Sequence, residues 1–170
     1  MNCQPTVNIV LIAPEIPQNT GNIIRLCANV GANLHLVKPL GFHLDNPGLR
    51  RASLDYNDLT NITVYKSTDE LFKTLPIDRT YGATIPGTVF YTTPRYQIGD
   101  TIILGSESVG LSSHVREKLN PGNLVNIPMM PGNRSLNISN AAAIIVYEMW
   151  RQIGFSGAPS MPNQNQFYFS

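Results

Sequence analysis

Short polar side chains follow a turn rich in proline and glycine in the last third of the chain. The run 126–143 reads Asn-Ile-Pro-Met-Met-Pro-Gly-Asn-Arg-Ser-Leu-Asn-Ile-Ser-Asn-Ala-Ala-Ala. Ser135 and Asn137 offer a hydroxyl and an amide, and Ser139 is placed to cap a following helix. Such a junction presents polar groups to a ligand, although an ordinary strand-to-helix turn has the same composition.

Two further loops have residue types suited to ligand binding. Residues 19–22, Asn-Thr-Gly-Asn, open a helix, and a helix N-terminus favours an anion such as phosphate. Arg25 lies about one turn later, where its planar fork can hold a phosphate or extend to solvent. Residues 105–111, Gly-Ser-Glu-Ser-Val-Gly-Leu, match neither the Walker loop nor the dinucleotide fingerprint. The three loops define one site if they face a common crevice.

The elements that must position these loops alternate between strands and helices. Apolar runs predict strands over 7–13, 34–37, 62–65, 80–84, 101–104 and 124–127. Helical spacing and caps predict helices over 20–30, after the Ser67 and Glu70 capping box, from Ser112 or Ser113 to Leu119, and over 139–153. This alternation predicts an α/β domain with a mainly parallel sheet and helices on both faces. We expect one domain over 1–170, with a loosely ordered tail from about 157.

Composition limits the classes of function. Apolar residues make up 42% and charged residues 14%, and the net charge of +1 gives no overall attraction to nucleic acid. An RNA contact would therefore need a local basic patch. Cys3 and Cys27 form no CxxC pair and the histidines show no zinc spacing, so no metal site is expected. Because no signal-type or membrane-spanning apolar segment occurs, we expect a cytoplasmic protein with no membrane contact.

The last predicted helix is apolar around most of its circumference. Its apolar residues are Ala141, Ala142, Ile144, Ile145, Val146, Met149, Trp150 and Ile153. A helix of this kind must be covered on more than one side, by its own core or by a partner. The pattern favours a homodimer formed through this helix.

The three loops, taken in order, resemble the motifs of SpoU-type RNA ribose methyltransferases in the SPOUT superfamily. The matching segments are 8–29, 104–111 and 127–141, so the resemblance covers nearly the whole chain. It implies a fold with a C-terminal trefoil knot, S-adenosylmethionine as cofactor, and a homodimer packed through the first and last helices. The chain departs from the family pattern at Val109, where close relatives often have a basic residue. That departure puts in doubt any RNA contact expected at this position.

Roles for individual residues come from the same resemblance. The implied cofactor-binding residues are Ala83, Gly105, Glu107, Ile127, Ser135 and Leu136. The implied catalytic residues are Arg25, Ser135 and Asn137, and the RNA-binding residues are Asn19, Arg25, Arg50, Arg51 and Tyr147. Because a guanidinium is a poor base, Arg25 is expected to anchor a phosphate and orient the hydroxyl that is methylated. Glu107 is expected to brace the loops or to accept a proton.

The substrate follows from similarity within the family. Segments 49–56 and 147–152, with the short length, are most similar to the bacterial members that methylate the 2′-hydroxyl of the tRNA wobble nucleotide. This predicts methyl transfer to a wobble cytidine or carboxymethylaminomethyluridine of leucine tRNAs, with binding at the anticodon stem-loop. The alternatives are another tRNA or rRNA site, a non-catalytic RNA-binding module, or a nucleotide-binding doubly wound domain.

Overall fold

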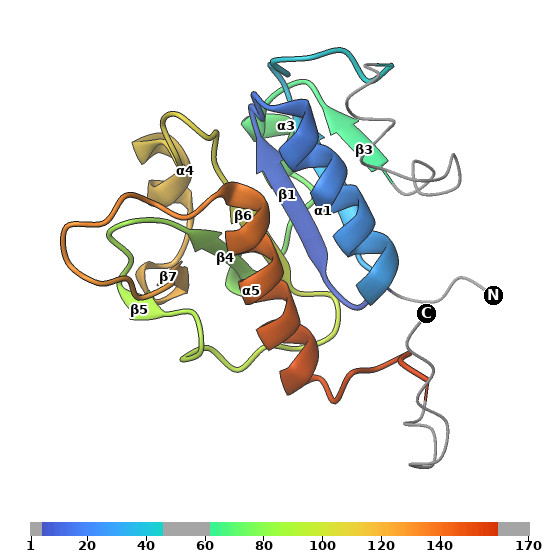
Figure 1. Cartoon of the computed structure of the whole chain (residues 1–170), viewed down its shortest axis with the longest axis vertical. Helices are drawn as coiled ribbons and strands as arrows, with labels where there is room; N and C mark the ends of the chain where they lie inside the picture. The colour runs from blue at the N-terminus through green and yellow to red at the C-terminus, as the bar shows by residue number, and fades with distance from the viewer. Residues whose placement is uncertain (1–4, 46–61, 160–170) are drawn as a thin grey trace.

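Seven parallel strands form the centre of the molecule (Figure 1). The computed structural model describes residues 5–45 and 62–159. The sheet order is β3-β2-β1-β6-β4-β7-β5, and every pairing in it is parallel. The strands are β1 (Asn8–Ile12), β2 (Asn33–Val37), β3 (Ile62–Tyr65), β4 (Thr80–Ala83), β5 (Val89–Phe90), β6 (Thr101–Leu104) and β7 (Leu124–Asn126). The predicted α/β class and parallel sheet are confirmed.

Helices cover both faces of this sheet, as the alternation predicted. The helices are α1 (Pro17–Val30), α3 (Thr68–Phe72), α4 (Ser113–Lys118) and α5 (Ile138–Gln152), with short 3-10 turns at Ile77–Arg79 and Pro121–Asn123. Alternate residues of one strand enter different cores because successive side chains point to opposite faces. In β6, Ile102 packs with α1 and α5, whereas Ile103 packs with α3 and α4.

The ends of the two long helices differ from the prediction by a few residues. Helix α1 begins at Pro17 rather than Thr20, because proline suits the first turn, where its missing N–H costs nothing. It ends as expected at Gly31, which adopts a left-handed φ of 69°. Helix α5 is capped by Asn137, whose side chain accepts from the Ser139 backbone N–H, so the prediction of Ser139 as the cap was wrong.

One strand was missed by the sequence patterns. The two residues of β5 lie between β4 and β6, where no strand was predicted, and they pair only with β7. A two-residue strand is too short to show alternation in sequence. Its position at the sheet edge depends on β7, which comes later in the chain.

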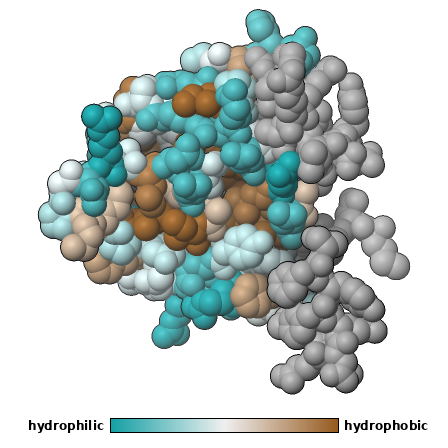
Figure 2. Space-filling model, viewed as in Figure 1, coloured by the Kyte–Doolittle hydropathy of each residue, from teal (hydrophilic) through white to brown (hydrophobic). Residues whose placement is uncertain are grey.

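Helices α1 and α5 lie side by side on one face of the sheet (Figure 1). Apolar patches lie among polar side chains on this face (Figure 2). Ile144 and Tyr147 of α5 are exposed, whereas the exposed residues of α1 are mainly polar. In the described ranges, no helix has both the length and the apolar character needed to cross a membrane.

Candidate functional site

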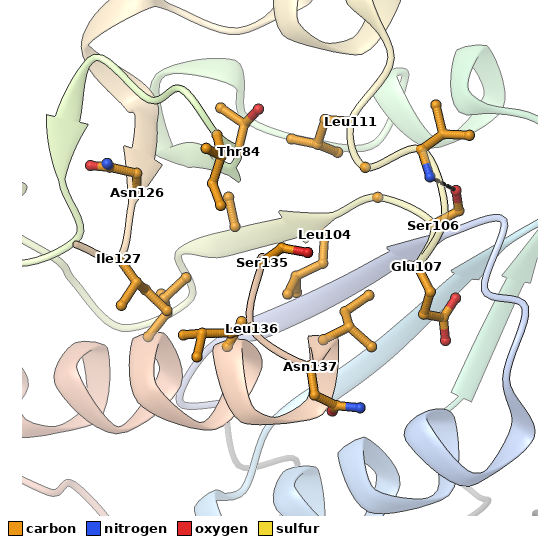
Figure 3. A pocket seen from close by; sticks show the side chains of 18 of the residues that line it. Thr84, Leu104, Ser106, Glu107, Leu111, Asn126, Ile127, Ser135, Leu136 and Asn137 are labelled. Atoms are coloured by element: carbon orange, nitrogen blue, oxygen red, sulfur yellow. Dashed lines mark hydrogen bonds between the residues drawn. The ribbon is translucent and has the colours of Figure 1, made fainter. Parts of the chain in front are cut away.

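A cavity of about 590 Å³ opens where β4, β6 and β7 end and α5 begins (Figure 3). Its walls come mainly from segments 83–85, 104–111, 125–127 and 135–138. Because parallel strands have their carboxyl ends at one sheet edge, loops that are distant in sequence converge there. Two of the three loops identified in the sequence form much of the wall, and Ile16 and Asn19 add the third.

All six residues predicted to bind the cofactor line this cavity. They are Ala83, Gly105, Glu107, Ile127, Ser135 and Leu136. Ser135 lies between the segment that contains Thr84 and the start of α5, and Glu107 lies at the opposite end from Ile127 (Figure 3). The structure brings these side chains together, and their contacts with a cofactor stay a prediction.

Gly105 allows two parts of the cavity wall to approach closely. A Cβ atom built at this position would lie 2.0 Å from the carbonyl carbon and oxygen of Gly110. The approach is fixed by a tight turn in which the Gly110 N–H donates to the Ser106 carbonyl at 2.8 Å. Any larger residue at 105 would push this turn away from β6.

Glu107 ties the second loop to the start of α1. Its Oε2 accepts from the Glu15 backbone N–H at 2.8 Å, and its Oε1 accepts from the Ile16 N–H at 3.2 Å. Oε1 also accepts from the Asn19 side-chain amide at 3.0 Å. An anion was predicted at this helix N-terminus, and a carboxylate of the same chain occupies that position. The expected bracing role of Glu107 agrees with these contacts.

Asn137 extends the same network to the start of α5. Its Nδ2 donates to the Asn19 Oδ1 at 3.0 Å. Its Oδ1 accepts from the Ser139 N–H at 2.9 Å and from the Ser139 hydroxyl at 2.6 Å. The three loops are therefore joined by the side chains of Glu107, Asn19 and Asn137.

Of the other predicted RNA-side residues, Asn19 lines the cavity, whereas Arg25 and Tyr147 lie away from its wall. Arg25 is exposed on α1 and does not line the cavity. Tyr147 is exposed on α5, where its ring packs edge-on against Trp150 at 5.6 Å. Asn19 is buried and its amide is engaged by Glu107 and Asn137. Arg50 and Arg51 lie outside the described residues. Contacts of these residues with RNA stay predictions.

Sequence reasoning missed several residues of the cavity wall. Thr84 and Ile85 follow β4, and Asn126 ends β7. The rule that ligands bind at the carboxyl ends of parallel strands could have identified these residues from the sequence. Arg116 lines the cavity from α4, and no sequence signal indicated it, because only the packing of α4 determines which of its residues face the cavity.

The cavity wall contains few charges. Among the described residues that line it, only Glu107 and Arg116 are ionisable. Within 5–45 and 62–159, no group of three His, Cys, Asp or Glu residues is arranged to hold a metal ion. The rest of the wall mixes apolar side chains with hydroxyls and amides, as small-molecule sites do.

Comparisons with known proteins identify the family of this chain. The family model described as the SpoU rRNA Methylase family matches residues 6–147. The chain is 48% identical over 151 residues to a tRNA (cytidine(34)-2′-O)-methyltransferase of Methylovorus glucosotrophus (strain SIP3-4), covering 89% of this chain and 98% of the relative.

Two solved structures are also similar. One, described as "Structural insights into the 2-OH methylation of C/U34 on tRNA", has a TM-score of 0.81 and 36% identity, covering 88% of this chain and 97% of the other. The SpoU methyltransferase AviRb from Streptomyces viridochromogenes, in complex with AdoMet, has a TM-score of 0.78 and 25% identity, covering 93% of this chain and 61% of the other. This chain belongs to the SpoU rRNA Methylase family.

Proposed function

We propose that this chain transfers a methyl group from S-adenosylmethionine to the ribose 2′-hydroxyl of nucleotide 34 of tRNA. The observation that supports it best is the 48% identity to a tRNA (cytidine(34)-2′-O)-methyltransferase, which spans nearly the full length of both chains. The structure described for 2-OH methylation of C/U34 supports the same substrate. Cytidine and carboxymethylaminomethyluridine at the wobble position of leucine tRNAs are the substrates that we propose.

The cavity fits the proposed cofactor. Its volume of about 590 Å³ lies within the range of sites that enclose a small molecule. Apolar side chains such as Leu104 and Ile127 suit an adenine ring, and Ser106 and Thr84 offer hydroxyls for polar groups. When bound, S-adenosylmethionine supplies an electrophilic methyl group, so the protein needs mainly to align the ribose hydroxyl and ease loss of its proton.

Three residues are proposed to perform that alignment. Ser135 presents a hydroxyl in the cavity wall, and a hydroxyl can donate and accept a hydrogen bond. Asn137 is held in one orientation because Asn19 and Ser139 engage both ends of its amide. Arg25 is proposed to anchor a neighbouring RNA phosphate, since a guanidinium remains charged and binds phosphate through its fork.

We further propose that α5 is threaded through a trefoil knot and that two chains pair through α1 and α5. Membership of the SpoU family supports the knot, and the exposed Ile144 and Tyr147 of α5 support the pairing. A crystal structure whose chain trace unties when its ends are pulled would contradict the knot.

Arg50 and Arg51 are proposed to bind phosphates of the anticodon stem-loop. Replacing both arginines should reduce the slope of the logarithm of the tRNA-binding constant against the logarithm of the salt concentration, by the share of about two phosphate contacts.

Methylation of unmodified tRNA tests the proposed function. Purified protein is incubated with labelled S-adenosylmethionine and separate tRNA and rRNA pools, and the methylated position is mapped by mass spectrometry. The expected product is a ribose methyl at nucleotide 34. Transfer only to rRNA would favour the second candidate, an rRNA methyltransferase as the family description has it. Transfer to a base would overturn both.

Replacing Arg25 separates the RNA side from the cofactor side. Arg25→Ala should lower turnover with tRNA by about 100-fold, because a misplaced hydroxyl loses alignment, and should leave affinity for S-adenosylhomocysteine within about twofold. Asn29→Ala, at another exposed position of α1, is the matched control and should change neither quantity. Equal losses of turnover and cofactor affinity in Arg25→Ala would contradict the role on the RNA side.

A further inference from the structure

Arg116 is a half-buried cation in the cavity wall. It follows Val115, which is buried in the core beneath α4, and its own side chain lines the cavity. The only other ionisable residue of the described wall is Glu107. Because the Glu107 carboxylate already accepts three N–H groups, its charge is stabilised at the start of α1. Arg116 is therefore the one charged group of the described wall that is free to meet a ligand.

The guanidinium of Arg116 lacks a counterion in the described part of the chain. Three other cations of the described residues do have one: Arg79 pairs with Asp100, Lys118 with Asp69, and Arg151 with Glu148. Arg116 forms no such pair with any residue in 5–45 or 62–159. A half-buried charge without a partner is costly, so an anion that enters the cavity gains by pairing with it.

We propose that Arg116 binds the carboxylate of the amino-acid half of S-adenosylmethionine. This inference rests on the proposed assignment of the cavity to that cofactor. The carboxylate is the only anionic group of the molecule, whereas its sulfonium and ammonium groups are cationic and are repelled by a guanidinium. A planar fork also matches a carboxylate with two parallel hydrogen bonds.

The position of Arg116 favours this small ligand over an RNA phosphate. The side chain lines the same cavity as Leu104 and Ile127, which lie near the carboxyl ends of β6 and β7. Arg25, the residue proposed to anchor an RNA phosphate, is exposed on α1 and lies outside the cavity wall, whereas Arg116 is half-buried in it. The geometry therefore directs the amino-acid end of the cofactor toward α4.

A pair of ligands that differ only in the carboxylate tests the contact. Titration calorimetry measures the affinity of the full chain for S-adenosylmethionine and for decarboxylated S-adenosylmethionine. The unmodified protein should bind the first at least about tenfold more tightly, since the second lacks the charged acceptor. Arg116→Gln should lose most of this difference, with the affinity for the decarboxylated ligand within about twofold of the unmodified protein.

Two further variants control for charge and for general effects of α4. Arg116→Lys keeps the charge without the fork and should retain part of the discrimination. Glu117→Gln, at the next and exposed position, should bind both ligands as the unmodified protein does. Circular dichroism of each variant verifies the fold.

Each alternative result has a defined meaning. Equal affinity of the unmodified protein for the two ligands would overturn the inference without any variant. Equal losses of affinity for both ligands in Arg116→Gln would also overturn the inference. So would an Arg116→Gln variant with unchanged cofactor affinity and a raised KM for tRNA, because that result would indicate a phosphate contact. Failure of the unmodified protein to bind either ligand would instead refute the proposed function.

Discussion

At the scale of single residues, Glu107 joins one loop of the cavity wall to the start of α1. Its two oxygens accept from the N–H groups of Glu15 and Ile16 and from the Asn19 amide. One carboxylate thus satisfies donors at the start of α1 that have no partner within the helix. A glycine-rich loop after β6 is in this way fixed to the loop after β1.

Glu107→Gln should lower both stability and activity. A glutamine has one acceptor oxygen, so either the Glu15 N–H or the pair from Ile16 and Asn19 faces an NH₂ group instead. The free energy of unfolding should fall by about 1 kcal/mol, because these bonds are partly exposed. Urea denaturation measures the loss, with Glu117→Gln as the control. Unchanged stability and unchanged tRNA methylation would show that the carboxylate is dispensable.

At the scale of elements, the start of α5 combines a helix cap with a contact between loops. The Oδ1 of Asn137 accepts from the Ser139 N–H, while its Nδ2 donates to Asn19. The first interaction stabilises α5, and the second positions its N-terminus against α1. The two roles belong to different atoms of one side chain and can be separated by substitution.

Asn137→Asp should keep the cap and lose the loop contact. An aspartate caps a helix as well as asparagine, so the free energy of unfolding should stay within about 0.5 kcal/mol of the unmodified protein. Its carboxylate faces the Asn19 oxygen without a donor, and Asn19 cannot flip without losing Glu107. Methylation of tRNA should therefore fall sharply in a single-turnover assay.

Asn137→Ala, which removes both interactions, should cost about 1 kcal/mol in addition to the loss of activity. If Asn137→Asp methylated tRNA as fast as the unmodified protein, the contact with Asn19 would have no part in alignment.

A polar cluster joins the first three strands. The His35 Nε2 lies 3.3 Å from the Asn8 Oδ1, and the Tyr65 hydroxyl lies 3.4 Å from the His35 Nδ1. Burial lowers the pKa of His35 from its ordinary value of 6.5. The unfolded chain therefore binds a proton more readily than the folded one in the pH range below about 6.5.

Stability should consequently fall as the pH drops through that range. Between about pH 7 and about pH 5, the unmodified protein should lose more unfolding free energy than His35→Gln, which cannot titrate there. Urea denaturation at the two pH values gives the difference. An equal loss in both proteins would show that folding leaves the proton affinity of His35 unchanged.

At the scale of the whole molecule, strands that are distant in sequence form the centre of the sheet. β6 lies between β1 and β4, and β7 lies between β4 and β5. The order brings the three loops to one edge, while α1 and α5 cover one face (Figure 1). On their outer surface, Ile144 and Tyr147 of α5 are exposed beside mainly polar residues of α1, and that surface is the one proposed to pair two chains (Figure 2).

Ile144→Asp should convert the proposed dimer into a monomer. Ile144 is 36% exposed on α5, so the substitution disturbs little of the chain's own core but would bury a charge in the interface. Sedimentation velocity measures the molecular mass. Phe90→Asp, at an exposed position of the edge strand β5, should leave the dimer intact. A monomeric unmodified protein, or a dimeric Ile144→Asp variant, would contradict pairing through α5.

Local patterns in the sequence were enough for the class of fold and for the loops of the site. Apolar runs located six of the seven strands, and Gly31 marked the end of α1, because both signals depend only on neighbouring residues. The motif resemblance selected six residues that the structure brings to one cavity. Side-chain chemistry and spacing are local properties, so a sequence determines them directly.

Tertiary structure decided what depends on contacts between distant segments. The strand order and the short strand β5 depend on pairing between strands that are not neighbours in sequence. The bonds from Asn19 to Glu107 and to Asn137 join residues that are 88 and 118 positions apart. The orientation of Arg116 toward the cavity depends on how α4 packs on the sheet. Periodicity in a sequence indicates which face of a helix or strand is buried, but not which distant segment packs against that face. The site is built from contacts between such segments.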